Sequence, residues 1–389
     1  MSLSRTLIFL TIVLSLLTGL HRFLWARLIR DTGLPQPWRM LGGAVLVGLP
    51  TLVLGSFLTS RLLPSTLAFP VSWLGYAWLG TMFYLVLLLL PFEPLRLGAA
   101  IAAPLGWTVD PARRLLLSRL AAGVAGVGAF GAAGIGLWTV ARGPELVRIS
   151  VPIRNLDPKL AGLRIVQITD VHISPTLGAD FLADIVARCN ALDADIVAIT
   201  GDLIDGTVDQ LRASVAPLAR LKSKLGTFFV TGNHEYYYDA VAWVAHLPTL
   251  GVRVLRNERV RIARDGAVFD LAGVDDWRAE GMAPGHGADL PGALRGRDPK
   301  VPVVLMAHQP KAVTEASALG VDLQLSGHTH GGQLAPLQYL VALDQPAIAG
   351  MYRFGGTALY VSRGTGYWGP PMRVGVPAEI TAIELVPAV

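Results

Sequence analysis

Charged side chains are scarce in this sequence, and cysteine is almost absent. Only 16% of the 389 residues are charged and 52% are hydrophobic, whereas soluble domains typically carry about 25% charged residues. The net charge of +5 lies mostly around the apolar stretches, so it is no footprint of nucleic acid, and none is expected as a partner. The single cysteine, Cys189, cannot form an intrachain disulfide and gives no indication of the redox compartment.

Four long stretches before about residue 142 have little or no charge. They lie at about 6–28, 40–60, 67–90 and 115–141. Because about 20 apolar residues suffice to cross a bilayer, we predict four transmembrane helices in a region spanning residues 1–148. The alternative of buried helices in a soluble protein fits these lengths poorly. The first stretch could instead be a signal peptide, but no A-x-A-like cleavage site follows it.

The distribution of arginine predicts which side of the membrane each loop occupies. Two loops are rich in arginine. The loop between the first two helices carries Arg22, Arg27, Arg30 and Arg39, and the loop between the third and fourth carries Arg96, Arg113, Arg114 and Arg119. The N-terminus has only Arg5, and the loop between the second and third helices has only Arg61. Positive loops stay cytoplasmic. We therefore expect a multi-pass protein of the inner or plasma membrane, with residues 149–389 on the extracytoplasmic side.

Residues 149–389 alternate between strand-like and helix-like segments. Apolar, β-prone runs occur at 163–168, 195–200, 227–230, 301–306 and 322–325, and helical spacing occurs at 181–190, 208–222 and 240–250. This alternation predicts an α/β domain. Residues 252–270 resemble a β-hairpin, residues 339–385 contain further strand-like pieces, and residues 277–300, with five Gly and three Pro, are predicted to be a loop.

Five short motifs rich in Asp, Asn and His each follow one of the strand-like runs. They are Asp170-Val171-His172, Gly201-Asp202, Gly232-Asn233-His234-Glu235, Ala307-His308 and Gly327-His328-Thr329-His330. Open α/β sheets place their ligands at the carboxyl ends of strands, so these side chains are expected to converge. Each motif alone is usually an ordinary loop, but all five in this order favour one functional site.

The donor set of these motifs indicates metal chemistry. Nitrogen and oxygen ligands without a thiolate suit Mn²⁺, Fe or Zn²⁺. Two such ions about 3.5–4 Å apart can activate a water and stabilise both oxygens of an in-line displacement at phosphorus. Two close cations repel unless anions surround them, and Asp202 is the candidate bridging carboxylate.

Residues 163–385 resemble the calcineurin-like metallophosphoesterases, whose pattern D-x-H, G-D, G-N-H-[DE], an isolated His and G-H-x-H is complete here. Residues 307–311 and 330–333 look like the bacterial membrane-associated branch of that family. The resemblance implies a four-layer α/β sandwich with two facing mixed sheets. It also implies that one metal is held by Asp170, His172, Asp202 and His330, and the second by Asp202, Asn233, His308 and His328. His234 would then be catalytic and not a ligand, acting on the phosphoryl group and leaving oxygen while a metal-bridging hydroxide attacks.

These patterns lead to one favoured function and several alternatives. We expect a membrane-anchored phosphoesterase that hydrolyses a phosphate ester, with a phosphodiester favoured and a lipid or nucleotide-sugar left open as the substrate. A UDP-2,3-diacylglucosamine pyrophosphatase of lipid A synthesis would need a cytoplasmic site. A non-catalytic membrane sensor or scaffold would be expected to lack some ligands, and a transporter to carry charges within its helices.

Some residues outside the motifs also have expected places. The loop 277–300 and the region around Trp368 are expected to shape the substrate pocket. Arg363 or Arg373 could meet a second phosphate or be a surface cation. His21, His246 and His286 are interpreted as ordinary interface or surface residues.

Overall fold

The computed structural model describes residues 3–105 and 109–388, which belong to two compact units. The first unit contains Met1–Leu63 and Leu67–Leu137, and the second contains Pro64–Thr66 and Trp138–Val389. Strand β1 (Glu145–Ile153) begins four residues before the predicted start of the second domain at residue 149. Each unit is described by itself below.

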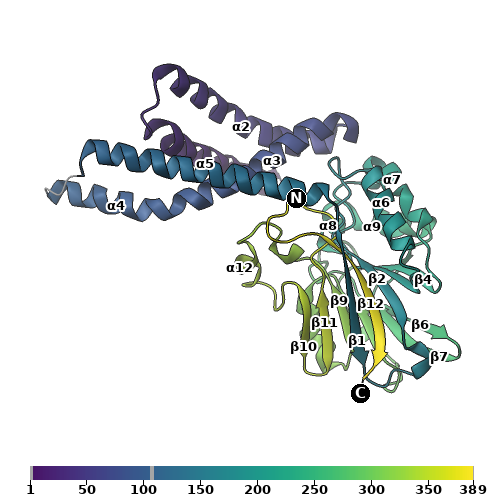
Figure 1. The fold of residues 1–389 in the computed structure, drawn as a ribbon. Helices are drawn as coiled ribbons and strands as arrows, with labels where there is room; N and C mark the ends of the chain where they lie inside the picture. Colours follow the sequence, from purple (N-terminus) through teal and green to yellow (C-terminus); the bar gives the residue numbers. More distant parts are fainter. Residues whose placement is uncertain (1–2, 106–108, 389) are drawn as a thin grey trace. The chain divides into compact units, whose positions relative to one another are not determined.

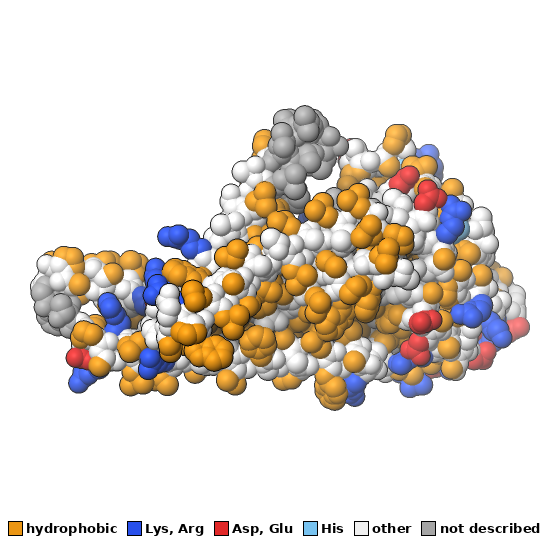
Figure 2. All heavy atoms as spheres, turned by 90° about the horizontal axis from the view of Figure 1, so that it is seen from above, with side chains coloured by type: hydrophobic (Ala, Val, Ile, Leu, Met, Phe, Trp, Pro, Cys, Tyr) orange, Lys and Arg blue, Asp and Glu red, His pale blue; other side chains and the backbone are white. Residues whose placement is uncertain are grey.

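The first unit is helical, as predicted. Its helices are α1 (Leu3–Leu24, continued by a π-helical segment Trp25–Arg30), α2 (Gln36–Leu62), α3 (Ser65–Leu89), α4 (Glu93–Ala102) and α5 (Pro111–Ala141). Within the described residues, four segments are long and apolar enough to cross a membrane: Thr11–Arg30, Gln36–Ser60, Thr66–Leu105 and Pro111–Ala141. Hydrophobic side chains form broad bands over this unit (Figure 2). Helix α4 was not expected, because the sequence predicted only a loop around Arg96.

The two arginine-rich loops of this unit meet each other. Arg27, after the first helix, forms an ion pair with Glu93 (2.5 Å), and Arg96 forms one with Asp31 (2.5 Å). Arg119 Nε donates a hydrogen bond to the carbonyl oxygen of Thr32 (2.9 Å). These contacts bring the two loops to the same end of the helical unit, as four helices of alternating direction require.

The second unit is built from two six-stranded sheets (Figure 1). The order of the first is β1, β12 (Glu379–Pro387), β2 (Leu163–Ile168), β3 (Ile196–Ile199), β4 (Gly226–Phe229) and β5 (Arg253–Val254). The order of the second is β10 (Gly350–Phe354), β11 (Thr357–Val361), β9 (Leu323–Ser326), β8 (Val303–Met306), β7 (Ala267–Gly273) and β6 (Glu258–Arg264). Both sheets mix parallel and antiparallel pairs.

Alternating side chains of each strand explain the layering. Ile165 and Ala198 belong to the core between the two sheets, whereas Val166 and Val197 pack outward in a second core. Helices α6 (Ala179–Asn190), α7 (Val208–Val215) and α9 (Ala240–His246) contribute to that second core, and α10 (Leu290–Ala293) and α11 (Val313–Ala318) cover the other sheet. Both faces of each central strand are therefore buried, which explains their nearly continuous apolar sequences. The predicted four-layer α/β sandwich is confirmed.

Proline shortens two of the predicted helices. The segment predicted at 208–222 is α7 followed by a 3₁₀ turn, Ala216–Arg220, with Pro217 in its first turn. The segment predicted at 240–250 is α9 followed by a 3₁₀ turn, Leu247–Leu250, that contains Pro248. Proline has no amide hydrogen to continue an α-helix. The predicted loop 277–300 also contains one short helix, α10, and the region 339–385 contains the short helix α12 (Gln338–Val341) at its start.

Strand direction places the start of β1 at the same edge of the first sheet as the carboxyl ends of β2, β3 and β4. Strands β2, β3 and β4 are parallel, so their carboxyl ends share one edge. Strand β12 is antiparallel to β2, and β1 is parallel to β12 with Glu145 opposite Glu379. The first residue of β1 therefore lies at the edge where β2 ends.

Candidate metal centre

The five predicted motifs occupy the loops at the carboxyl ends of five strands. Asp170 and His172 follow β2, Asp202 follows β3, and Asn233 begins the short helix α8 (Asn233–Tyr237) after β4. In the other sheet, His308 follows β8, and His328 and His330 follow β9. Apart from His328, which is partly buried, these predicted ligands are buried.

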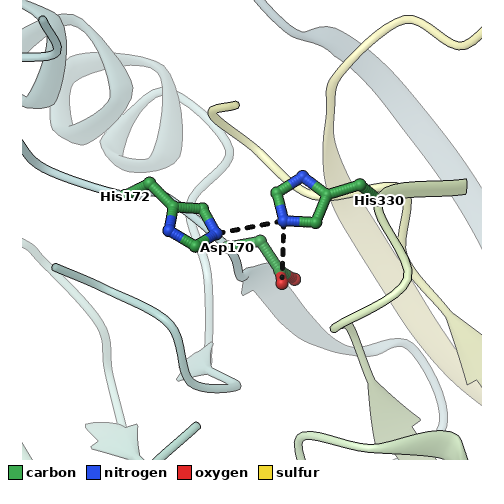
Figure 3. Close-up of side chains that lie close together, drawn as sticks. All are labelled: Asp170, His172 and His330. Atoms are coloured by element: carbon green, nitrogen blue, oxygen red, sulfur yellow. Dashed lines mark hydrogen bonds and ion pairs between the residues drawn. The ribbon is translucent and has the colours of Figure 1, made fainter. Parts of the chain in front are cut away.

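One group of three side chains combines Asp170, His172 and His330. Their ligand atoms all lie within 4.8 Å of one another. The Nε2 atoms of His172 and His330 face each other at 3.0 Å, and His330 Nε2 lies 3.4 Å from Asp170 Oδ1 (Figure 3). Two ring nitrogens and a carboxylate oxygen that converge in this way form a suitable set of ligands for a divalent cation.

A second group combines Asp202, His308 and His328. His308 Nε2 lies 3.2 Å from Asp202 Oδ2 and 3.2 Å from His328 Nδ1. His308 Nδ1 donates a hydrogen bond to the carbonyl oxygen of Thr200 (2.8 Å). Because a carbonyl can only accept, this bond holds the proton on Nδ1 and directs Nε2 into the site, as in many metal-binding histidines.

Asp202 stands between the two groups. Its Oδ2 atom lies 3.2 Å from Nε2 of His308 in one group and 3.9 Å from Nε2 of His172 in the other. Burial acts to raise the pKa of Asp202, but the nearby histidines, His308 first, hold that pKa well below its usual range. Asp202 is therefore an anion at the centre, which is the position expected of a bridging ligand.

Glu235 holds the Asp202 loop in place. Its buried carboxylate accepts hydrogen bonds from the backbone amides of Asp202 (3.0 Å), Leu203 (2.8 Å) and Gly232 (2.6 Å). A Cβ atom on Gly232 would lie 2.2 Å from Asp202 Oδ1, so only glycine fits there. The motif Gly232-Asn233-His234-Glu235 thus supplies both site residues and the support of Asp202.

Asn233 supplies an unsatisfied oxygen. Its Oδ1 atom is buried, and among the described residues no group donates a hydrogen bond to it. A buried polar atom without a partner is costly unless a ligand or water satisfies it. Together with the two groups of Asp and His, this oxygen fits a pair of divalent cations.

The residue that sequence analysis missed is Asp205. Its Oδ1 atom accepts hydrogen bonds from Nδ1 of His234 (2.6 Å) and of His172 (3.1 Å). Burial acts to raise the pKa of Asp205, but the two nearby histidines hold that pKa well below its usual range. The bonds orient both imidazoles so that their Nε2 atoms are left for the centre. The only signal in the sequence is its position three residues after Asp202.

Backbone conformation also marks the site. Asp170, His172, Asp202, His328 and His330 all have φ between 50° and 71°, in the left-handed region. Asp, Asn and His adopt it more readily than other side chains do, yet such residues still cost about 1–3 kcal/mol each and cluster where function requires them. Five of the seven predicted ligands share this strain, which favours a selected arrangement over an accidental one.

The structure gives partners to several residues outside the motifs, and it excludes a surface position for Arg373 and His21. Arg373 is wholly buried, and its Nη2 lies 3.2 Å from His330 Nδ1, so it is no surface cation. Arg363 forms ion pairs with Glu379 (2.5 Å) and Glu145 (3.5 Å). His21 is buried in the helical unit and accepts a hydrogen bond from Trp78 (3.0 Å), and His286 is bonded to the Tyr236 hydroxyl (3.0 Å).

The fold and the site define a class of hydrolase, an α/β sandwich with a metal centre at the strand ends. A sequence profile described as calcineurin-like phosphoesterase matches residues 163–332. The chain is 37% identical to a transmembrane protein with metallophosphoesterase domain from Danio rerio, over 97% of this chain and 89% of that one. This chain belongs to the metallophosphoesterases, and it is a metal-dependent phosphoric ester hydrolase.

Two further relatives match about two thirds of this chain. A protein of the same description from Bos taurus is 44% identical over 64% of this chain and 59% of its own length. An uncharacterized metallophosphoesterase from Helicobacter pylori is 39% identical over 63% of this chain and 64% of its own. The chain thus spans less than two thirds of these two relatives, whereas the alignment with the fish protein covers most of both chains.

Proposed function

We propose that this chain is a membrane-anchored phosphoesterase that works with two divalent cations. The observation that carries the proposal is the position of Asp202 Oδ2 within 3.9 Å of a histidine of each group. One cation would be held by Asp170, His172, Asp202 and His330, and the other by Asp202, Asn233, His308 and His328. The complete donor set gives no support to a non-catalytic scaffold.

The protein residues around the ions have their own proposed tasks. When bound, the ions supply Lewis acidity and lower the pKa of a water that attacks phosphorus. His234, fixed by Asp205 through Nδ1, has Nε2 directed to the centre, 3.9 Å from Asp202 Oδ2. That atom can contact the phosphoryl group and give a proton to the leaving oxygen. Phosphodiesters are the proposed substrates, and their leaving alcohol would benefit from this proton.

Metal removal tests the proposal directly. The detergent-solubilised full chain should lose turnover of bis-4-nitrophenyl phosphate after chelation and dialysis, because the nucleophile and the charge stabilisation both depend on the ions. Addition of Mn²⁺, Fe²⁺ or Zn²⁺ should restore it, with about two ions per chain by mass spectrometry. Undiminished turnover by chains that hold no metal would contradict the proposal.

We also propose that residues 149–389 lie on the extracytoplasmic side. The contacts of Arg27 with Glu93 and of Arg96 with Asp31 support a common side for the two arginine-rich loops, and positive loops stay cytoplasmic. Protease added to intact spheroplasts should therefore digest this domain, with a cytoplasmic protein as the control. Digestion only after lysis would reverse the sidedness and favour the UDP-2,3-diacylglucosamine pyrophosphatase.

A further inference from the structure

Large apolar side chains are exposed on the loops and short helices around the metal centre. They are Tyr237, Trp277, Tyr339, Leu340, Leu343 and Trp368, and each is between 46% and 84% exposed. We call these six residues the apolar rim. Apolar patches of this kind on a folded domain usually mark an interaction surface.

Two members of the apolar rim touch the site itself. The rings of Tyr237 and Trp368 lie 5.1 Å and 5.7 Å from the ring of His234, measured between centroids. Gln333, three residues after His330, bonds to both backbone groups of Trp368 (3.0 Å to its amide nitrogen and 2.9 Å to its carbonyl oxygen). This part of the apolar rim is therefore in contact with the loops that carry the predicted metal ligands, which we call the metal loops.

The other members lie on two neighbouring segments. Tyr339 and Leu340 belong to α12, which contacts the turn His330–Gly332. Asp344, next to Leu343, forms ion pairs with Lys311 (2.6 Å) and with Arg278 (3.4 Å), the residue after Trp277. Figure 1 shows α8 and α12 at the end of this unit away from the C-terminus. The apolar rim therefore surrounds the edge where the metal loops lie.

The chain leaves its last apolar helix at this same edge. Helix α5 ends at Ala141 and β1 begins at Glu145, a step of at most about 14 Å for four residues. Glu145 forms an ion pair with Arg363 (3.5 Å). The next residue, Gly364, is so close to the site that a Cβ on it would lie 3.1 Å from Cβ of Asp170. A bilayer that holds α5 is thus within short reach of the metal edge.

We propose that the apolar rim rests on the bilayer in which the apolar helices are embedded, and that the metal centre takes phosphate esters whose alcohol part lies in that bilayer. Four of its six side chains are Tyr or Trp, and such amphipathic rings favour the membrane interface. The substrate class rests on the proposed phosphoesterase function, whereas the docking of the surface does not.

Fluorescence quenching tests the docking without any turnover. Leu343→Cys allows a nitrobenzoxadiazole label to be attached on the apolar rim. Ala263→Cys is the matched control, because Ala263 is exposed on β6 near the hairpin turn at the opposite edge. The native Cys189 is buried and should not react. The full chain is reconstituted in phosphatidylethanolamine and phosphatidylglycerol vesicles, with or without 5-doxyl-phosphatidylcholine.

The doxyl lipid should cause loss of emission from the label at position 343 and not from that at 263. Equal quenching at both positions, or none at either, would overturn the docking. A label at 343 that is shifted to the blue but not quenched would show that protein, such as a second copy of the chain, covers the apolar rim, and this too would overturn it.

A matched pair of substrates tests the second half of the proposal. In the same vesicles, 4-nitrophenyl dodecyl phosphate should give a higher kcat/KM than 4-nitrophenyl methyl phosphate, and Leu343→Asp should lower that ratio while Ala263→Asp retains it. Equal ratios for all chains would overturn the bilayer substrate class. Hydrolysis of neither ester would instead contradict the proposed phosphodiesterase function, and the quenching result would stand by itself.

Discussion

Asp202→Asn should lower turnover by roughly 10²-fold or more, the scale expected when the electrostatics of a site are lost. The substitution keeps the size of the side chain and removes the one charge that the two groups share. Asp202 Oδ2 lies 3.2 Å from His308 Nε2 and 3.9 Å from His172 Nε2. Without this anion, two cations at the centre would repel each other, so the metal content measured by mass spectrometry should fall together with turnover.

Asp209→Asn is the matched control for this result. Asp209 lies on α7, is exposed, and pairs only with the neighbouring Arg212 (2.6 Å) among the described residues, so the same chemical change should leave metal content and turnover near normal. Circular dichroism would show whether the Asp202 variant keeps its fold. A folded Asp202→Asn chain with two metals and near-normal turnover would remove Asp202 from the bridging position.

Much of the fold could be predicted because the central strands are buried on both faces. Their continuous apolar runs, such as residues 163–168 and 301–306, are unambiguous when helices alternate with them. The short helices were harder. Four residues at α12 and four at α10 carry too little periodicity to be recognised, and the extent of α7 depended on where Pro217 ends the α-helical hydrogen bonds.

The site could be predicted as far as its residues are tied to strand ends. The positions of the five motifs could be predicted because each follows an apolar run. The structure brings six of their side chains into two compact groups. Asp205 lies in a loop after Leu203 and Ile204, where an aspartate is ordinary, and only the distances to His172 and His234 show its role. Trp277 and Trp368 of the apolar rim lie in the two regions expected to shape the pocket. The rim as a whole could not be predicted, because exposure is a property of the folded chain.

Asp205 and His234 have to be understood together. The hydrogen bond between Asp205 Oδ1 and His234 Nδ1 (2.6 Å) fixes one ring nitrogen and leaves the other for the substrate. The His234 amide also donates to Asp202 Oδ1 (2.8 Å), so the same residue is anchored at its backbone. A histidine held at its ring and at its backbone can act on a leaving oxygen without first being ordered. General acid catalysis requires such a positioned side chain.

His234→Ala should therefore lower turnover while the chain still holds two metals. General acid assistance is typically worth about 10²–10⁴-fold, and the loss should be largest for esters with poor leaving groups, because an alkoxide needs a proton far more than a nitrophenolate does. The measurement is a series of aryl and alkyl phosphodiesters, with His246→Ala as the control on the next helix, α9. Asp205→Asn should show the same dependence on the leaving group, since it disturbs the same ring. If metal content fell in parallel with turnover for every ester, His234 would be a ligand, and the proton would have to come from another group.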